Sequence, residues 1–187
     1  MLRVMMCFLF LYSGLTQAAI IAGNPQGTVT LVDIYDYQCR HCHREYAVIE
    51  QLIAQNPTLT VKFMPVAVLN NTSLLEAAAA IAATQVPGDF EQFNAWALQT
   101  EPMNDPEVSL VLKSLKLTSP AFFAAMHSRE TQAQLLEGLQ LLKQLHLDGV
   151  PVILIYPTQH PERQQIFAGE QTTAVLQNAI DHDEILE

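Results

Sequence analysis

The chain has 187 residues, half of them hydrophobic, and its 19 acidic residues outnumber 9 basic ones to give a formal charge of −10. This excess of acid, without a cluster of Lys and Arg, argues against nucleic acid or an anionic membrane as a partner. The length is sufficient for one domain with a sizeable core.

The N-terminus has the pattern of a signal peptide. Arg3 supplies a positive charge, residues 4–15 form an apolar stretch that contains Cys7, and Thr16 and Ala18 are small residues at the positions that signal peptidase reads. The stretch is shorter than the about 20 residues of a membrane span. We therefore expect residues 1–18 to be removed on export to a bacterial periplasm, where disulfides persist. A retained membrane anchor is the alternative.

The next segment predicts a strand, a helix and a second strand. Residues 28–35 form a continuous β-branched and apolar run, typical of a strand that is buried on both faces. A second strand is predicted over 58–68, after Asn56-Pro57 ends the intervening helix. Strand, helix and strand at this scale indicate a βαβ unit with parallel strands. The inward positions expected for the helix are Tyr46, Ile49, Leu52 and Ile53.

Residues 71–147 are predicted to be an all-helical insertion. The first helix is expected to begin with the capping box Ser73 to Glu76 and to end near Thr84. The last helix is expected to carry Leu135, Leu139 and Leu142 inward and to close at Asp148-Gly149. The N-caps predicted for the later helices are Asp89, Asp105, Ser119 and Ser128.

Strands return after this insertion. Residues 152–156 and 164–168 predict two strands, and 172–180 predict a C-terminal helix with Val175, Leu176 and Ile180 on its apolar face. A βαβ half and a ββα half therefore flank the helical block.

The motif Cys39-Arg40-His41-Cys42 lies where the first strand pattern changes to a helical one. The first sulfur is then at a helix N-terminus, where unpaired N–H groups and the macrodipole favour a thiolate. This predicts Cys39 as an exposed nucleophile and Cys42, one turn later and more buried, as the resolving thiol. Arg40 and His41 are expected to stabilise the Cys39 thiolate and so favour an oxidising potential.

Two other readings of the motif involve a bound group. Cys39, Cys42 and His43 also match the attachment motif of c-type haem, with His43 as the iron ligand. The buried strand before the motif argues against haem, which would also leave Val150-Pro151 without a role. A zinc site is less favoured still, because four ligands within five residues cannot close a tetrahedron. We expect neither a metal nor a cofactor.

Residues 35–45, from Tyr35 through the cysteines to Glu45, resemble the active-site segment of DsbA-like thiol–disulfide oxidoreductases. Gly149-Val150-Pro151 resembles the cis-proline loop of that family, and residues 166–169 resemble its last strand. The resemblance covers nearly all of the mature chain. It implies a thioredoxin fold whose halves, residues 19–70 and 148–187, are separated by the inserted helical domain 71–147.

The resemblance also implies roles for individual residues. Pro151 would be cis, and the Val150 backbone would pair with an extended client peptide. Asp33 and Lys62 look like the buried acid and lysine that help move the proton of the resolving thiol in thioredoxin-like proteins. His41 resembles the intervening histidine of strong oxidases, whereas Arg40 stands where they usually carry proline.

These observations predict a monomeric periplasmic enzyme that donates disulfides to reduced exported proteins. In the family, a quinone-linked membrane partner of the DsbB type reoxidises such an enzyme. Isomerase or reductase activity is the alternative within the same fold. Isomerases of this compartment usually dimerise through an extra N-terminal domain, and the few residues expected before the first strand favour the oxidase.

Overall fold

The computed structural model describes residues 20–86 and 90–184. The predicted signal peptide and the predicted cap Asp89 lie outside the described residues. Within the described ranges, no helix has the length and apolarity needed to cross a membrane.

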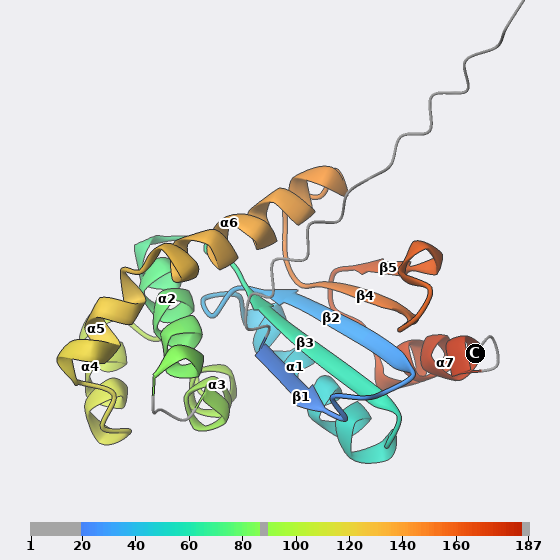
Figure 1. Ribbon diagram of the computed structural model, residues 1–187, viewed down its shortest axis with the longest axis horizontal. Coiled ribbons are helices and arrows are strands. Elements are labelled where there is room, and N and C mark those ends of the chain that lie inside the picture. Colours follow the sequence, from blue (N-terminus) through green and yellow to red (C-terminus); the bar gives the residue numbers. More distant parts are fainter. Residues whose placement is uncertain (1–19, 87–89, 185–187) are drawn as a thin grey trace, which may run out of the picture.

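The core of the molecule is a five-stranded mixed sheet (Figure 1). The central strand β2 is buried along its whole length, as its continuous apolar sequence predicts. It pairs in parallel with β3 and antiparallel with β4, while β1 and β5 are antiparallel edge strands. The order across the sheet is β1 (Ile20–Gly23), β3 (Leu59–Pro65), β2 (Val29–Tyr35), β4 (Val152–Pro157) and β5 (Gln165–Ala168).

The edge strand β1 was not predicted from the sequence. It pairs with β3 and places Ile20 in the core, with 4% of the residue exposed. Four residues are too few to show a periodic pattern of hydrophobic positions. The strand is recognised only by its backbone pairing with β3.

Helices cover both faces of the sheet (Figure 1). On one face, α1 (Arg40–Gln55) and α7 (Thr173–Glu184) pack on the side chains of Leu31 and Ile153. On the other face, α6 (Arg129–Gln144) places Leu142 against Val32. The successive residues of β2 therefore alternate between two separate apolar layers.

The remaining helices lie between β3 and β4 in sequence and gather at one end of the sheet (Figure 1). This order, a βαβ half, a helical insertion and a ββα half, confirms the predicted fold class. The helices are α2 (Asn71–Gln85), α3 (Phe90–Gln99), α4 (Asp105–Ser114) and α5 (Pro120–Met126).

Two of the predicted N-caps are wrong by a few residues. The cap of α2 is Asn70, which accepts a hydrogen bond from the Ser73 N–H, so Ser73 is the third helical residue and not the cap. Asn104 caps α4 in the same way, and Asp105 is already helical. Asn caps a helix as well as Ser or Asp does, so the earlier Asn takes the position in each case. The predicted caps Ser119 and Ser128 are confirmed.

Two helix ends also differ from the sequence prediction. Helix α6 ends at Gln144 and not at Asp148-Gly149, because His146 adopts a left-handed conformation with φ 57°. Helix α7 continues to Glu184, and Val175 is 41% exposed although an inward position was predicted for it.

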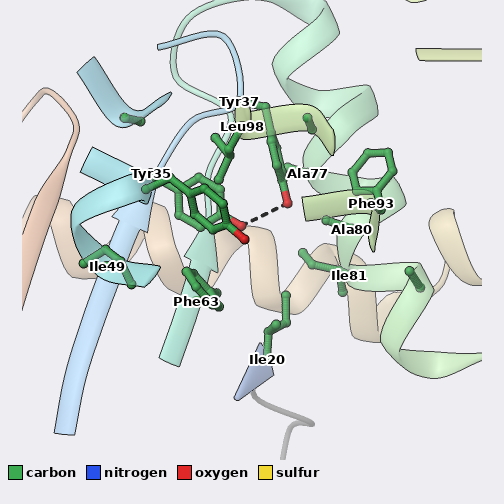
Figure 2. Close-up of a cluster of buried hydrophobic side chains, with 14 of the residues drawn as sticks. Ile20, Tyr35, Tyr37, Ile49, Phe63, Ala77, Ala80, Ile81, Phe93 and Leu98 are labelled. Carbon is green, nitrogen blue, oxygen red and sulfur yellow. Dashed lines mark hydrogen bonds between the residues drawn. The ribbon is translucent and has the colours of Figure 1, made fainter. Parts of the chain in front are cut away.

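A polar contact joins the end of β2 to α3 inside the core. Figure 2 shows the two tyrosines that take part in it, Tyr35 and Tyr37. The hydroxyl oxygens of Tyr35 and Tyr37 lie 2.9 Å apart, and the two O–H groups donate to Asn94 Oδ1 over 2.7 and 2.8 Å. Phe63 and Phe93 pack edge-on against this pair. Buried hydroxyls need such partners, so the contact fixes the insertion against the strand that leads to the cysteines.

Candidate active site

The loop between β2 and α1 is held by the buried carboxylate of Asp36. Its Oδ1 accepts from the Gln38 N–H over 2.8 Å, and its Oδ2 accepts from the Val68 N–H over 2.9 Å. The Cys39 N–H donates to the Asp36 carbonyl over 2.9 Å. Sequence reasoning gave Asp36 no role, although an Asp two residues before a turn amide is a known turn signal.

Cys39 is the N-cap of α1, as its place at the strand-to-helix junction predicts. Its Sγ accepts from the Cys42 N–H over 3.4 Å and lies 3.6 Å from the Val150 carbonyl oxygen. The pKa of the Cys39 thiol is lowered to about 6, chiefly by a hydrogen bond from the Cys42 side chain, while desolvation opposes the shift. Backbone N–H groups of Cys42 and His41 lower this pKa further, as expected at a helix N-terminus.

The two thiols differ strongly in acidity. Burial raises the pKa of Cys42 far above its ordinary value, and the hydrogen bond to Cys39 adds to this shift. Both cysteines are free thiols in the structure. Cys39 is 7% exposed and Cys42 is 3% exposed, so the first sulfur is more enclosed than the sequence suggested.

The loop before β4 closes over Cys39. The Val150–Pro151 peptide bond is cis, as the resemblance implied. The Val150 carbonyl faces the Cys39 sulfur, and the Pro151 carbonyl accepts from the Gly169 N–H over 2.9 Å. The loop therefore connects the cysteine motif to the end of β5.

His41 is part of an ion cluster that the sequence did not indicate. Its Nδ1 lies 3.0 Å from Glu170 Oε2 and 2.8 Å from Arg44 Nη2, and Arg44 donates to both oxygens of Glu170. The pKa of the Glu170 carboxyl is lowered to about 2, first by the hydrogen bond from Arg44 and then by that from His41. Arg44 lies one helical turn after His41, but no local signal points to Glu170, which comes from the β5–α7 loop.

Arg40 was expected to stabilise the Cys39 thiolate, but it is not among the groups that lower the pKa of Cys39. Its guanidinium is 2.8 Å from Glu101, and both side chains are largely exposed. The interactions that lower the Cys39 pKa come from Cys42 and His41. A solvated pair of this kind contributes little energy.

The predicted pairing of Asp33 with Lys62 is wrong. Asp33 is opposite Phe63 in the β2–β3 register, and Lys62 is opposite Val32. Because successive residues of a strand point to opposite faces, Lys62 is on the α6 side of the sheet, whereas Asp33 is on the α1 side. Asp33 is 3% exposed, and burial, Glu45 and Cys39 raise its pKa well above the ordinary value.

Glu45 is the carboxyl group that interacts electrostatically with Asp33 instead. It is 1% exposed, and its Oε1 accepts from the Gln171 N–H over 2.9 Å. Burial raises the pKa of Glu45 to about 7, against the effect of that hydrogen bond. Its position three residues after Cys42, on the inward stripe of α1, is the sequence signal that could have revealed it.

The haem reading of the motif is contradicted by the geometry of His43. Its Nδ1 lies 2.6 Å from the Thr100 carbonyl oxygen, and its Nε2 lies 2.6 Å from the Tyr37 carbonyl oxygen. These two contacts leave neither nitrogen free to ligate iron. Among the residues that the structure describes, no three His, Cys, Asp or Glu side chains gather as metal ligands would.

Fold and site together define a thioredoxin-fold protein with a pair of thiols at a helix N-terminus. The thioredoxin family model matches residues 15–182, so the chain belongs to the thioredoxin family. The thioredoxin fold that the resemblance implied is confirmed. No curated protein matches the chain in sequence.

Several solved structures share this fold over most of their length. A thioredoxin-like oxidoreductase from Silicibacter pomeroyi is similar with 25% identity and a TM-score of 0.79, covering 88% of this chain and 91% of the other. The thiol–disulfide exchange protein α-DsbA2 from Wolbachia pipientis has 23% identity and a TM-score of 0.75, covering 88% and 86%. A periplasmic thioredoxin-like protein from Salmonella enterica serovar Typhimurium has 19% identity and a TM-score of 0.73, covering 89% and 90%.

Proposed function

We propose that the protein is a disulfide-donating oxidase of reduced exported proteins, with Cys39 and Cys42 as its catalytic pair. A client thiolate attacks the Cys39 sulfur of the Cys39–Cys42 disulfide, and Cys42 leaves. A second client thiol then attacks the client sulfur of the mixed disulfide and releases Cys39 as a thiolate. The client gains a disulfide, and the enzyme gains two electrons and becomes a dithiol.

The observation that carries this proposal is the low pKa of Cys39, about 6, beside a Cys42 thiol whose pKa is raised. Interactions that stabilise the Cys39 thiolate stabilise the reduced protein, and a stable reduced form makes the disulfide a stronger oxidant. Cys39 is also the better leaving group of the two, because a thiolate of lower pKa leaves faster. Client release is then favoured over retention of the mixed disulfide.

The Val150–Pro151 loop is proposed to bind the client. The Val150 carbonyl lies 3.6 Å from the Cys39 sulfur, so a peptide that pairs with this backbone would bring its own cysteine to Cys39. Pairing through backbone groups recognises extended segments with little regard to sequence. This suits an enzyme with many unfolded clients.

We also propose an exported, monomeric enzyme with residues 19–70 and 148–187 as one domain and 71–147 as the inserted one. The signal-peptide pattern at 1–18 supports a periplasmic location, as does the periplasmic origin of the Salmonella protein of the same fold. A membrane protein of the DsbB type would then reoxidise the dithiol. Isomerase or reductase activity is the alternative within this class.

Oxidative folding of a reduced client by the mature protein tests the proposal. We expect Cys39→Ser to abolish disulfide transfer, because the attacked sulfur is lost. Cys42→Ser, mixed with a client that already carries a disulfide, should accumulate mixed disulfides, because Cys39 opens the client disulfide and no Cys42 is present to release the client. A non-reducing gel and mass spectrometry would detect them. Full activity of Cys39→Ser would overturn the assignment. Reshuffling of a scrambled client without net oxidation would favour the isomerase.

A further inference from the structure

His43 of α1 joins the β2–α1 loop to the inserted helices. Its Nε2 lies 2.6 Å from the carbonyl oxygen of Tyr37, two residues before Cys39. Its Nδ1 lies 2.6 Å from the carbonyl oxygen of Thr100, which directly follows the last residue of α3. The ring therefore lies between the loop that leads to the cysteines and the end of a helix in the insertion. We call this pair of contacts the His43 bridge.

Both partners of the ring are carbonyl oxygens, which accept hydrogen bonds and cannot donate them. A neutral imidazole has one N–H donor and one bare nitrogen that can only accept. In a neutral ring, one of the two contacts would set the lone pair of a nitrogen against that of an oxygen 2.6 Å away. An imidazolium donates from both nitrogens, and charge-assisted hydrogen bonds are short. The two distances therefore indicate that the ring of His43 carries two protons.

The end of α3 favours a cation for a separate reason. The last carbonyl groups of a helix have no partner within the helix, and the macrodipole adds partial negative charge there. The Thr100 hydroxyl donates back to the Trp96 carbonyl over 3.0 Å, and the Thr100 carbonyl accepts from His43. The ring therefore meets the negative end of α3 with a positive charge.

The titratable groups around the His43 bridge are mostly acidic. The cation among the groups within two turns of His43 on its side of α1, and in the two segments that it joins, is Arg40, which is paired with Glu101 over 2.8 Å. Nearby negative charge favours the protonated form of a histidine. The remaining titratable groups in these segments are acids, namely Asp36, Tyr37, Cys39, Tyr46 and Glu50.

A second set of contacts ties the same loop to the insertion. Gln38 Nε2 donates to Glu76 Oε2 over 2.9 Å and to the Met103 carbonyl over 2.8 Å. These contacts do not involve His43, so they keep the loop attached to the insertion when His43 is replaced. A substitution of His43 therefore isolates the effect of the bridge on the backbone at Tyr37.

We propose that His43 is a doubly protonated positioning residue that fixes the β2–α1 loop by donating to the Tyr37 and Thr100 carbonyl groups. The bridge holds the strand-to-helix junction in the conformation in which Cys39 caps α1. It also makes the end of α3 part of the support of the reactive thiol. For its effect on thiol–disulfide exchange, this role rests on the proposed Cys39–Cys42 pair.

Nuclear magnetic resonance measures the protonation state of the ring directly. Long-range ¹H–¹⁵N spectra of the reduced mature protein distinguish an imidazolium, with two similar nitrogen signals, from a neutral ring, whose bare nitrogen is shifted far downfield. An unperturbed histidine is mostly neutral at pH 7.5, whereas we expect His43 to be an imidazolium at this pH. Comparison with His43→Gln identifies its signals among those of the six histidines, and backbone assignment serves if that variant does not fold. A bare nitrogen on His43 at pH 7.5 would overturn the inference.

Hydrogen exchange measures the positioning. The Gln38 and Cys39 N–H groups donate to Asp36, and their protection should fall about tenfold in His43→Gln, which lacks the charge and one donor. His43→Arg restores a cation with several donors, so it should keep most of the protection. His127→Gln, at an exposed histidine after α5, is the matched control and should change nothing.

Two results of the exchange experiment would overturn the positioning role. One is unchanged protection in His43→Gln, or a loss no larger than that in the control His127→Gln. The other is a loss in His43→Arg as large as that in His43→Gln, because the charge and its donors would then not hold the loop.

The reactivity of Cys39 connects the bridge to the exchange reaction. His43→Gln should move the midpoint of Cys39 alkylation by iodoacetamide to higher pH, because a looser loop no longer fixes the sulfur as the helix cap. His43→Arg should leave the midpoint close to that of the wild type. An unmoved midpoint in His43→Gln would overturn the role of His43 in positioning Cys39.

Failure of this inference can be told apart from failure of the proposed function. The resonance and exchange experiments use the reduced protein without a client, so they do not depend on disulfide transfer. A wild type that fails to oxidise clients, but has a doubly protonated His43, would contradict the oxidase and leave the bridge in place. A wild type that oxidises clients with a neutral His43 would overturn the bridge alone.

Discussion

At the residue scale, the acidity of Cys39 results from opposing effects. Enclosure of the sulfur raises its pKa, and hydrogen bonds from the Cys42 side chain and from two backbone N–H groups lower it more. The ring of His41 contributes the smallest of these effects through its charge. The intervening pair Arg40-His41 therefore matters less for the thiolate than the sequence suggested. The helix start itself matters more.

The pH dependence of alkylation tests this ranking. Iodoacetamide reacts with the thiolate, so the rate at Cys39 should rise with pH and be half-maximal near pH 6, where the thiol ionises. Cys42→Ala should move the midpoint to higher pH, because the largest stabilising hydrogen bond is lost. His41→Ala should move it in the same direction by less. A wild-type midpoint near 8.5, that of a free cysteine, would show that the helix start does not stabilise the thiolate.

At the scale of elements, α6 approaches the sheet closely because it carries glycine at position 138. A Cβ added to Gly138 would lie 2.5 Å from Val66 Cγ1 and 3.2 Å from Met64 Cγ. Val66 is fully buried, so it has little room to move. Glycine is therefore required here for close packing of the helix against β3.

Gly138→Ala should lower the free energy of unfolding by about 1–2 kcal/mol. Overpacking of a core costs about 1–3 kcal/mol, and alanine regains up to about 1 kcal/mol of helix propensity. Gly149→Ala is the control, because a Cβ at that position meets no atom within 4 Å. Urea denaturation of both variants would measure the difference. Equal stability of Gly138→Ala and the wild type would show that α6 is not packed as described.

Elements with a strong local sequence pattern could be predicted. Features that depend on contacts between distant segments could not. The buried run of β2, the place of Cys39 and the caps Ser119 and Ser128 depend on neighbouring residues, and all were predicted. The electrostatic interaction of Asp33 with Glu45 depends on the face of the sheet on which Asp33 lies. Lys62 lies on the neighbouring strand, as predicted, but it is opposite Val32 and not Asp33, and this difference of one residue puts it on the other face of the sheet.

At the scale of the whole molecule, the site is assembled from segments far apart in the chain. The cysteines lie on α1, and the Val150 carbonyl and Glu170 come from the second half of the sheet. The insertion contributes as well, since Gln38 Nε2 donates to Glu76 of α2 and to the Met103 carbonyl. The complete site, with its covering loop, its ion cluster and the contacts of Gln38, is therefore assembled from both halves and the insertion, and no local motif could have predicted it in full.

The central claim is that Cys39 and Cys42 form an oxidising pair that donates disulfides. An equilibrium redox titration of the mature protein in glutathione buffers, which follows these two thiols, tests it most directly. The Cys39 pKa of about 6 is below the about 7 of thioredoxin, so we expect a potential above roughly −200 mV, toward the about −120 mV of DsbA. A potential at or below roughly −200 mV would contradict the oxidase and indicate an isomerase or reductase.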